Sequence, residues 1–291
     1  MSDFSLFDES RLPPAYGLAN TGVICYFNSL LQMLAGCTSV AATAAAHAQE
    51  VGATLTGRAF LEYLAAPAGQ GHTRLLDALR ADLAARRPRV TFGAGQESAS
   101  EALVLLIDMI EPDAAPGDPP APGAITRLFQ HRSRAELTCP ACRRVASTAA
   151  DLSLVMYLGH YTAGDDFLQC VQSHDSETAD FGCECGAAAS RATRTYRLTM
   201  ASEILVFAFN MYTLPRGAPL PFPERFELPG DGEPLRYRLV GQVEHSGSLH
   251  GGHYWARGLR REGVAMLNDY SVMPSAFAPT PFTYLLAYHM V

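Results

Sequence analysis

One cysteine, Cys25, stands where the chain changes from a turn to a helix. Residues 17–36 read GLANTGVICYFNSLLQMLAG, with turn-forming residues before the cysteine and apolar residues at helical spacing after it. A helix dipole favours a thiolate at its N-terminus, and the free backbone N–H groups there can hold an oxyanion. Asn20, five residues upstream, could add its amide to that oxyanion hole. Cys25 is therefore a candidate nucleophile for acyl transfer, and the alternative is a small packed hydrophobe.

A histidine that could act as the base lies near the C-terminal end of the chain. His253 begins a predicted strand, HYWARGL, which turns at residues 260–263 into a second predicted strand, VAMLND. A hairpin of this kind brings positions 268–270 opposite His253, so that Asn268 or Asp269 lies beside the imidazole. Cysteine, histidine and an orienting amide or carboxylate form the triad of thiol hydrolysis. The alternative is a core histidine followed by an ordinary turn.

Two close pairs of cysteines predict a second kind of chemistry, a structural zinc site. They are Cys139 and Cys142 in CPAC, and Cys183 and Cys185 in CEC. Pairs of this kind, each near a turn, are typical of tetrahedral zinc coordination, and four sulfur ligands leave no open position for a catalytic metal. The second pair is one residue short, so the coordination could be distorted, or Cys170 or His174 could substitute as a ligand. The remaining alternative is a degenerate ribbon that folds without metal.

The composition is that of a globular protein and limits the possible partners. The chain has 291 residues, 48% of them hydrophobic, which is enough to bury a large core. A net charge of −7 argues against a nucleic-acid partner and leaves a basic protein or peptide ligand open. The acidic start does not resemble a signal peptide, and the longest apolar run, residues 102–110, is too short for a bilayer. With seven cysteines, an odd number, these features predict an intracellular protein, cytoplasmic or nuclear, without membrane association.

The elements that must position these residues follow from periodicity. Helices are predicted after Cys25 and over residues 73–85 and 97–110, and the Pro/Gly-rich stretch 111–123 predicts an exposed loop. From about residue 126 the pattern changes to short β-prone runs, at 195–200, 204–209, 237–243, 253–259 and 284–289. The predicted fold class is α+β, with helices first and antiparallel strands later.

Several motifs in order resemble the ubiquitin-specific proteases. The stretch GLANTGVICYFNSLLQML is similar to the cysteine box of that family, and YRLVGQVEHSGSLHGGHYWAR followed by NDYSV is similar to its histidine box. Intermediate pieces, among them ILVFAFNMY, PFPERFEL and PFTYLLAYHMV, also fit in order over nearly the whole chain. The resemblance implies a single papain-like catalytic domain over residues 1–291. Its helical thumb would span about 15–125, its fingers with a zinc ribbon mainly 126–200, and its antiparallel palm mainly 201–291.

The resemblance also assigns roles to single residues. It implies Cys25 as the nucleophile, His253 as the general base, Asn268 as its orienting partner with Asp269 able to assist, and Asn20 in the oxyanion hole. For the modifier's tail it implies contacts from five further positions, namely Gln96, Glu101, His245, Gly251 and Gly252. The last two would let the loop approach a diglycine substrate closely.

Two departures from the family pattern stand close to these positions. Val23 and Ile24 replace polar residues just before the nucleophile. Ser98 stands where the family commonly has an aspartate that, with the glutamate matching Glu101, binds arginines near the ubiquitin tail.

The activity implied by the resemblance is that of a cysteine isopeptidase which removes ubiquitin from conjugated proteins through an acyl-enzyme. Expected partners are ubiquitin or a ubiquitin-like modifier and its conjugates, and an activating partner protein is possible. Two alternatives stay open: a protease specific for another modifier, which Ser98 motivates, and a catalytically weak ubiquitin-binding scaffold.

Overall fold

The computed structural model describes residues 7–92, 95, 97–113, 121–159, 161–186, 190–210, 218–230, 232–248 and 251–291. Its helices come mostly first in the chain, and its strands follow. The helices are α1 (Cys25–Leu34), α2 (Thr38–Ala46), α3 (Ala48–Val51), α4 (Leu55–Ala65), α5 (His72–Arg86), α6 (Ala99–Ile110), α7 (Ala124–Phe129) and α8 (Phe167–Gln172), with a 3-10 turn at Glu9–Arg11.

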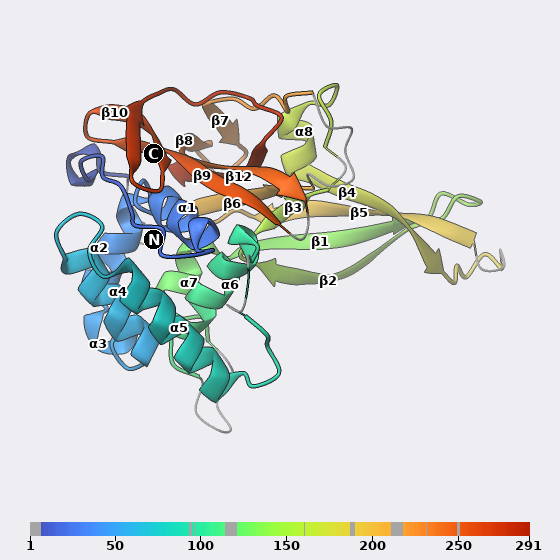
Figure 1. The fold of residues 1–291 in the computed structure, drawn as a ribbon. Helices are drawn as coiled ribbons and strands as arrows, with labels where there is room; N and C mark the ends of the chain where they lie inside the picture. Colours follow the sequence, from blue (N-terminus) through green and yellow to red (C-terminus); the bar gives the residue numbers. More distant parts are fainter. Residues whose placement is uncertain are drawn as a thin grey trace.

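Twelve strands form two sheets in the described parts of the chain. They are β1 (His131–Thr138), β2 (Val145–Ser153), β3 (Met156–Leu158), β4 (Ser173–Phe181), β5 (Ser190–Met200), β6 (Ile204–Phe209), β7 (Arg225–Leu228), β8 (Leu235–Ser248), β9 (Gly251–Arg260), β10 (Gly263–Asn268), β11 (Ser271–Pro274) and β12 (Thr283–Met290). The large sheet has the order β11-β10-β9-β8-β12-β6-β3, with β7 paired to β8. The smaller sheet, β2-β1-β5-β4, projects from the body as an arm (Figure 1).

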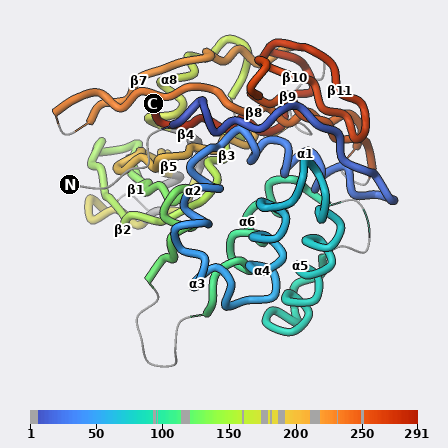
Figure 2. Tube along the Cα trace, turned by 90° about the vertical axis from the view of Figure 1, so that its left-hand side faces the viewer, coloured from blue at the N-terminus to red at the C-terminus, as the bar shows by residue number. Residues whose placement is uncertain are grey.

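Helix α1 lies between the helical part and the large sheet (Figure 2). All ten of its residues are buried, including the polar Asn28, Ser29 and Gln32, because it packs against β9, β8 and β10 on one side and α6 on the other. A helix that is buried all round can carry polar side chains only where they find hydrogen-bond partners. The Gln32 amide, for example, donates to the carbonyl of Tyr16 at 2.7 Å. This central position fixes the start of α1 against the large sheet.

The predicted α+β order is confirmed, with two local differences. Strand β3 pairs in parallel with β6, so the large sheet is mixed and takes one strand from the 126–200 region. The stretch 111–123 begins with a buried residue instead of an exposed loop, and residues 114–120 lie outside the described parts. Glu111 is buried because its carboxylate accepts from the backbone N–H groups of Ile125 and Thr126 at the start of α7, at 2.7 and 2.9 Å.

Among the described residues, no single helix is long and apolar enough to cross a membrane. Helices α1 and α2 meet that test of length and composition only when taken together, and they are bent by 82° at the break between them.

Candidate active site

Cys25 is the first residue of α1, as the sequence predicts, and its side chain is only 4% exposed. Burial raises the pKa of the Cys25 thiol, while the backbone N–H of Tyr254 on β9 acts in the opposite direction by favouring the thiolate. The two apolar residues just before Cys25, which depart from the family pattern, differ in exposure: Ile24 is buried and Val23 is 53% exposed. The thiol is thus held against β9, one residue from His253.

His253 bonds to Asn268 across the predicted hairpin. Its Nε2 donates to Asn268 Oδ1 at 2.6 Å. The strand pairing places Arg260 opposite Gly263 and Ala256 opposite Leu267, so the turn falls at the expected residues. Continued by one pair, this register puts Asn268 opposite Trp255 and on the same face as His253, because side chains alternate along a strand. The hairpin register left Asn268 and Asp269 open, and it is Asn268, the partner that the family resemblance implies, that contacts the imidazole.

Asp269 has a different set of contacts. Its carboxylate accepts from the amides of Asn20 and Asn28 at 3.0 and 2.9 Å, and its backbone carbonyl accepts from Leu18 at 2.9 Å. Its φ of 50° is left-handed, which turns the chain after Asn268 and directs the carboxylate towards α1. These contacts connect Asp269 to the segment around Cys25, and its expected assistance to the imidazole stays a prediction. Asn28 was missed as a site residue, although asparagine is rare in the chain.

Asn20 is oriented by its own turn as well as by Asp269. Its Oδ1 accepts from the backbone N–H of Gly22 at 3.2 Å and of Ile24 at 3.4 Å. An amide nitrogen carries two hydrogens, so the bond to Asp269 orients the group and leaves a second donor for an oxyanion.

A cleft of about 620 Å³ contains most of the positions expected to bind the modifier's tail. Glu101 on α6, His245 on β8, Gly251 on β9 and Tyr254 beside Cys25 all line it. His245 is buried against the Tyr254 ring, with the ring centroids 4.2 Å apart. Gly252 lies beneath it, since a Cβ there would come within 2.4 Å of His245 Nε2. Gln96 lies outside the described residues.

Ser98, the departure from the family pattern, caps α6. Its Oγ accepts from the backbone N–H of Glu101 at 3.4 Å and lies 2.8 Å from Ser100 Oγ and 2.7 Å from Tyr284 Oη. Ser100 and Tyr284 are themselves 2.8 Å apart, so three hydroxyl groups form a closed cluster in the wall of the cleft. The position supplies hydrogen bonds in place of a charge.

The four cysteines of the two predicted pairs meet at the end of the arm. Their sulfur atoms all lie within 4.8 Å of one another, with Cys139 and Cys185 at 3.9 Å and Cys142 and Cys183 at 3.5 Å. Zinc–sulfur bonds of about 2.3 Å in a tetrahedron require sulfur atoms about 3.8 Å apart, so the donor set fits a four-thiolate metal site.

Backbone turns explain how the shortened CEC pair still closes. Arg143 after the first pair and Gly186 after the second both have left-handed φ angles, 62° and 75°, and each turn is closed by a backbone hydrogen bond. An ion pair between Arg144 and Glu184 links the two turns. Cys170, the alternative ligand, lies on α8 against the hydrophobic core, and the side chain of His174 is outside the described part.

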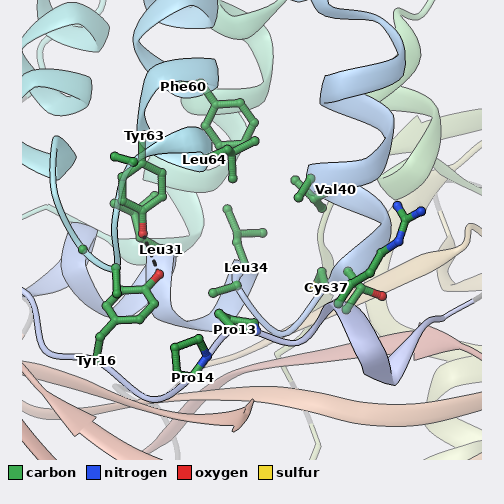
Figure 3. A pocket seen from close by; sticks show the side chains of 17 residues that line it. Pro13, Pro14, Tyr16, Leu31, Leu34, Cys37, Val40, Phe60, Tyr63 and Leu64 are labelled. Atoms are coloured by element: carbon green, nitrogen blue, oxygen red, sulfur yellow. Dashed lines mark hydrogen bonds between the residues drawn. The ribbon is translucent and has the colours of Figure 1, made fainter. Parts of the chain in front are cut away.

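A second hollow, of about 270 Å³, opens near the other end of α1 (Figure 3). Its lining is mainly apolar, from Leu31, Leu34, Val40 and Phe60, with the hydroxyl groups of Tyr16 and Tyr63 3.2 Å apart at one side. None of the candidate catalytic or tail-binding residues lines it. Cys37, which does, is buried, and burial raises the pKa of its thiol to about 12, as suits a packed residue.

Comparisons with known proteins identify the family and the fold of the chain. The family model of ubiquitin carboxyl-terminal hydrolase matches residues 16–288. A solved structure of the SAGA DUB module Ubp8/Sgf11/Sus1/Sgf73 bound to monoubiquitin is similar with a TM-score of 0.70 and 19% identity over 99% of this chain and 72% of that chain. The same module bound to ubiquitin aldehyde is similar with a TM-score of 0.69 and 20% identity, over 97% of this chain and 70% of that chain. A yeast SAGA DUB module with an Sgf73 mutant is similar with a TM-score of 0.68 and 19% identity, over 97% of this chain and 69% of that chain. Comparison with curated protein sequences finds no match. The chain therefore belongs to the ubiquitin carboxyl-terminal hydrolase family of deubiquitinating cysteine proteases.

Proposed function

We propose that Cys25, His253 and Asn268 are the catalytic residues with which this deubiquitinase hydrolyses the bond after the modifier's terminal glycine. His253 takes the proton of the Cys25 thiol, and the sulfur attacks the glycine carbonyl carbon. The backbone N–H groups at the start of α1 and the amide of Asn20 hold the oxyanion. His253 then gives its proton to the leaving lysine amine, which leaves an acyl-enzyme. Water, deprotonated by His253, hydrolyses the thioester and restores the thiol.

The observation that carries this proposal is the bond between His253 Nε2 and Asn268 Oδ1. The residue after His253 on the same strand, Tyr254, donates its backbone N–H to the Cys25 sulfur. Because Nε2 is occupied by Asn268, Nδ1 is the ring nitrogen left to exchange a proton with the thiol. The raised pKa of Cys25 means that the thiol keeps its proton at neutral pH, so the reaction needs a base in this position.

The 620 Å³ cleft is proposed to receive the modifier's C-terminal tail. Glu101 offers an exposed carboxylate for a basic tail residue, while His245 and Gly251 line the same cleft as Tyr254, whose backbone bonds to Cys25. Glycine at the modifier's end suits this position because it has no side chain that the residues beside the thiol would have to accommodate. The family match gives no support for another modifier or for an inactive scaffold, so ubiquitin is the substrate that we propose.

We further propose zinc as the ion held by Cys139, Cys142, Cys183 and Cys185. Bound zinc would stabilise the end of the arm and supply no catalytic step, since all four positions are taken by thiolates.

We also propose a division of the chain into thumb (about 15–125), fingers (mainly 126–200) and palm (mainly 201–291). The helical first part of the chain, the arm and the large sheet support this division. The similar SAGA modules contain Sgf11, Sus1 and Sgf73, which supports an activating partner for this chain too. Seven free thiols support an intracellular, cytoplasmic or nuclear location.

The test is covalent labelling with probes that carry an electrophile at the C-terminus of ubiquitin or of each ubiquitin-like modifier. We expect an adduct with the ubiquitin probe that is lost in Cys25→Ala and retained in Cys170→Ser. Loss of labelling in His253→Ala, with an unchanged melting temperature, would support the role of the base. An adduct that persists in Cys25→Ala would contradict the assignment of the nucleophile, and labelling only by another modifier would contradict the substrate.

A further inference from the structure

Trp255 lies beside His253 on the same face of β9. The indole and imidazole rings are nearly parallel, with an interplanar angle of 24° and centroids 6.2 Å apart. Trp255 is the single tryptophan of the chain. It lies two residues after His253, and residues two apart in a strand point to the same face.

One hydrogen bond does not fix the plane of an imidazole. The bond from His253 Nε2 to Asn268 holds one nitrogen, but the ring can still rotate about that bond and carry Nδ1 away from the thiol. A parallel aromatic neighbour restricts this rotation because tilting the imidazole would bring it against the indole face. Trp255 therefore supplies the restraint that Asn268 lacks.

Trp255 can act in this way because its own orientation is held by Glu244. The indole Nε1 donates to Glu244 Oε2 at 2.7 Å, and the indole also packs against Phe282 with ring centroids 5.6 Å apart. Glu244 stands opposite Trp255 on the neighbouring strand β8. The tryptophan is thus fixed on two sides.

Glu244 is a buried carboxylate, 1% exposed, and is itself fully bonded. Its Oε2 also accepts from Arg257 Nε at 2.8 Å, and its Oε1 accepts from Thr280 Oγ1 at 2.5 Å. A buried carboxylate with three donors is rigid, because rotating it would break charge-assisted bonds in a dry environment. The network explains why a charge is buried here, one strand away from the candidate base.

We propose that Trp255 is a positioning residue for His253 and that Glu244, by holding the Trp255 indole, sets the plane of the imidazole that exchanges a proton with Cys25. The inference rests on the proposed function only in taking His253 as the base. It predicts that loss of Glu244 or of the indole N–H slows the proton transfers and leaves substrate binding almost unchanged, since neither residue lines the tail cleft.

A double-mutant cycle tests the path from Glu244 through Trp255. The variants are Trp255→Phe, which keeps an aromatic ring without the N–H, Glu244→Met, which removes the carboxylate at similar volume, and the double variant. With a fluorogenic ubiquitin C-terminal amide, kcat should fall about 10-fold in each single variant and about 10-fold, not 100-fold, in the double variant, since small displacements of a reacting group are costly. KM should change less than about 2-fold. Glu244→Gln keeps an acceptor for the indole N–H, so it should retain most of the wild-type kcat that Glu244→Met loses.

The matched control is Glu227→Gln, which breaks an exposed ion pair with Arg236 at the edge of β7 and β8 and should leave kcat unchanged. Melting temperatures separate loss of folding from loss of positioning. Single-variant effects that multiply in the double variant would overturn the proposal, because Glu244 would then act independently of Trp255. A change confined to KM would overturn it as well, because Trp255 would then be a substrate contact.

Trp255 fluorescence measures the stack without any turnover. Replacing the imidazole removes the ring parallel to the indole, so the emission of Trp255 at a fixed pH should change in His253→Gln and stay unchanged in His47→Gln, an exposed histidine elsewhere in the chain. Glu244, which bonds to the indole, and Arg257, which bonds to Glu244, are the same in both variants. Emission that is the same in His253→Gln as in the wild type would contradict the stack. An active His253→Gln enzyme would instead contradict the proposed function, so the two failures are distinguishable.

Discussion

The Asn28 side chain, inside α1, donates to the carboxylate of Asp269 at 2.9 Å, across the junction between the nucleophile's helix and the turn after β10. Asn20 donates to the other oxygen of the same carboxylate at 3.0 Å. Asn268 immediately precedes Asp269, so one carboxylate fixes the segment around Cys25 relative to the partner of His253. The two halves of the candidate catalytic site come from opposite ends of the chain, and this contact holds them together.

Removing this carboxylate should lower both stability and kcat. In Asp269→Ala, two hydrogen bonds to a charged group are lost, each worth about 1.5–3 kcal/mol. The alanine must also adopt a left-handed φ, which costs about 1–2 kcal/mol. Asp269→Gly removes the bonds without that strain, so its free energy of unfolding should lie between wild type and Asp269→Ala. Denaturant titration and kcat measured together check this. A wild-type kcat in Asp269→Gly would show that the bonds from the Asp269 carboxylate to Asn20 and Asn28 are not needed for catalysis.

The resting thiol should be protonated and slow to react at neutral pH. An ordinary cysteine has a pKa of about 8.5. Burial raises the pKa of Cys25, so its thiol keeps the proton to higher pH than an ordinary cysteine does. The rate of alkylation by iodoacetamide should therefore keep rising through and above that pH. Cys25→Ala measures the contribution of the other thiols. A rate that is flat from pH 6 to 8 would instead indicate a preformed thiolate–imidazolium pair.

Neutralising Glu101 should weaken binding of the modifier and leave kcat unchanged. The carboxylate lines the tail cleft away from the reacting atoms, so Glu101→Gln should raise KM about 10- to 100-fold, as expected for one charge-assisted contact. The wild-type KM should also rise with salt, and less so in the variant. Ser98→Asp, which keeps a capping oxygen on α6, should lower KM by adding a second carboxylate. A KM unaffected by both changes would place the tail elsewhere.

The purified protein should contain about one zinc ion per chain, because the four sulfur atoms form one complete donor set. Cys142→Ser should release the metal and lower the melting temperature of the arm. Cys170→Ser, a cysteine outside the cluster, should retain it. Elemental analysis of the three proteins decides this, and a zinc-free wild type with unchanged stability would indicate a ribbon that folds without metal.

Stability should fall on acidification because of His289 in β12. Its side chain is fully buried, and burial lowers its pKa to about 4, well below the ordinary histidine value. The unfolded chain then binds a proton that the folded chain does not, between about pH 6.5 and 4, so this contribution is present above pH 6.5 and is lost as the pH falls. The neighbouring Glu203 has a raised pKa, also from burial, and acts in the opposite direction by favouring the acid side.

Denaturant unfolding at pH 7 and pH 5 measures this effect. His289→Gln should reduce the loss of stability between the two values, whereas the exposed His47 replaced by Gln should not. An equal loss of stability in His289→Gln would assign the effect to other groups.

Local pattern was sufficient to locate the elements that carry the candidate site. The apolar spacing after Cys25 predicted α1, and the run ILVFAF predicted β6 with the observed bounds, Ile204–Phe209. Helices such as α2, with the sequence TSVAATAAA, were not located, because small residues without periodicity give no signal and only burial against neighbouring helices stabilises them.

By itself, the sequence determined that a helix begins at Cys25, that His253 lies on a hairpin turning at residues 260–263, and that four cysteines come in two pairs. These depend on periodicity and turn chemistry, which act between near neighbours in the chain. Only the tertiary structure decided that Asp269 contacts Asn20 and Asn28, and that Glu244 holds Trp255. Those choices depend on which face of a strand packs against α1 and on a left-handed turn, and they are fixed by contacts between residues as far apart as 241 positions.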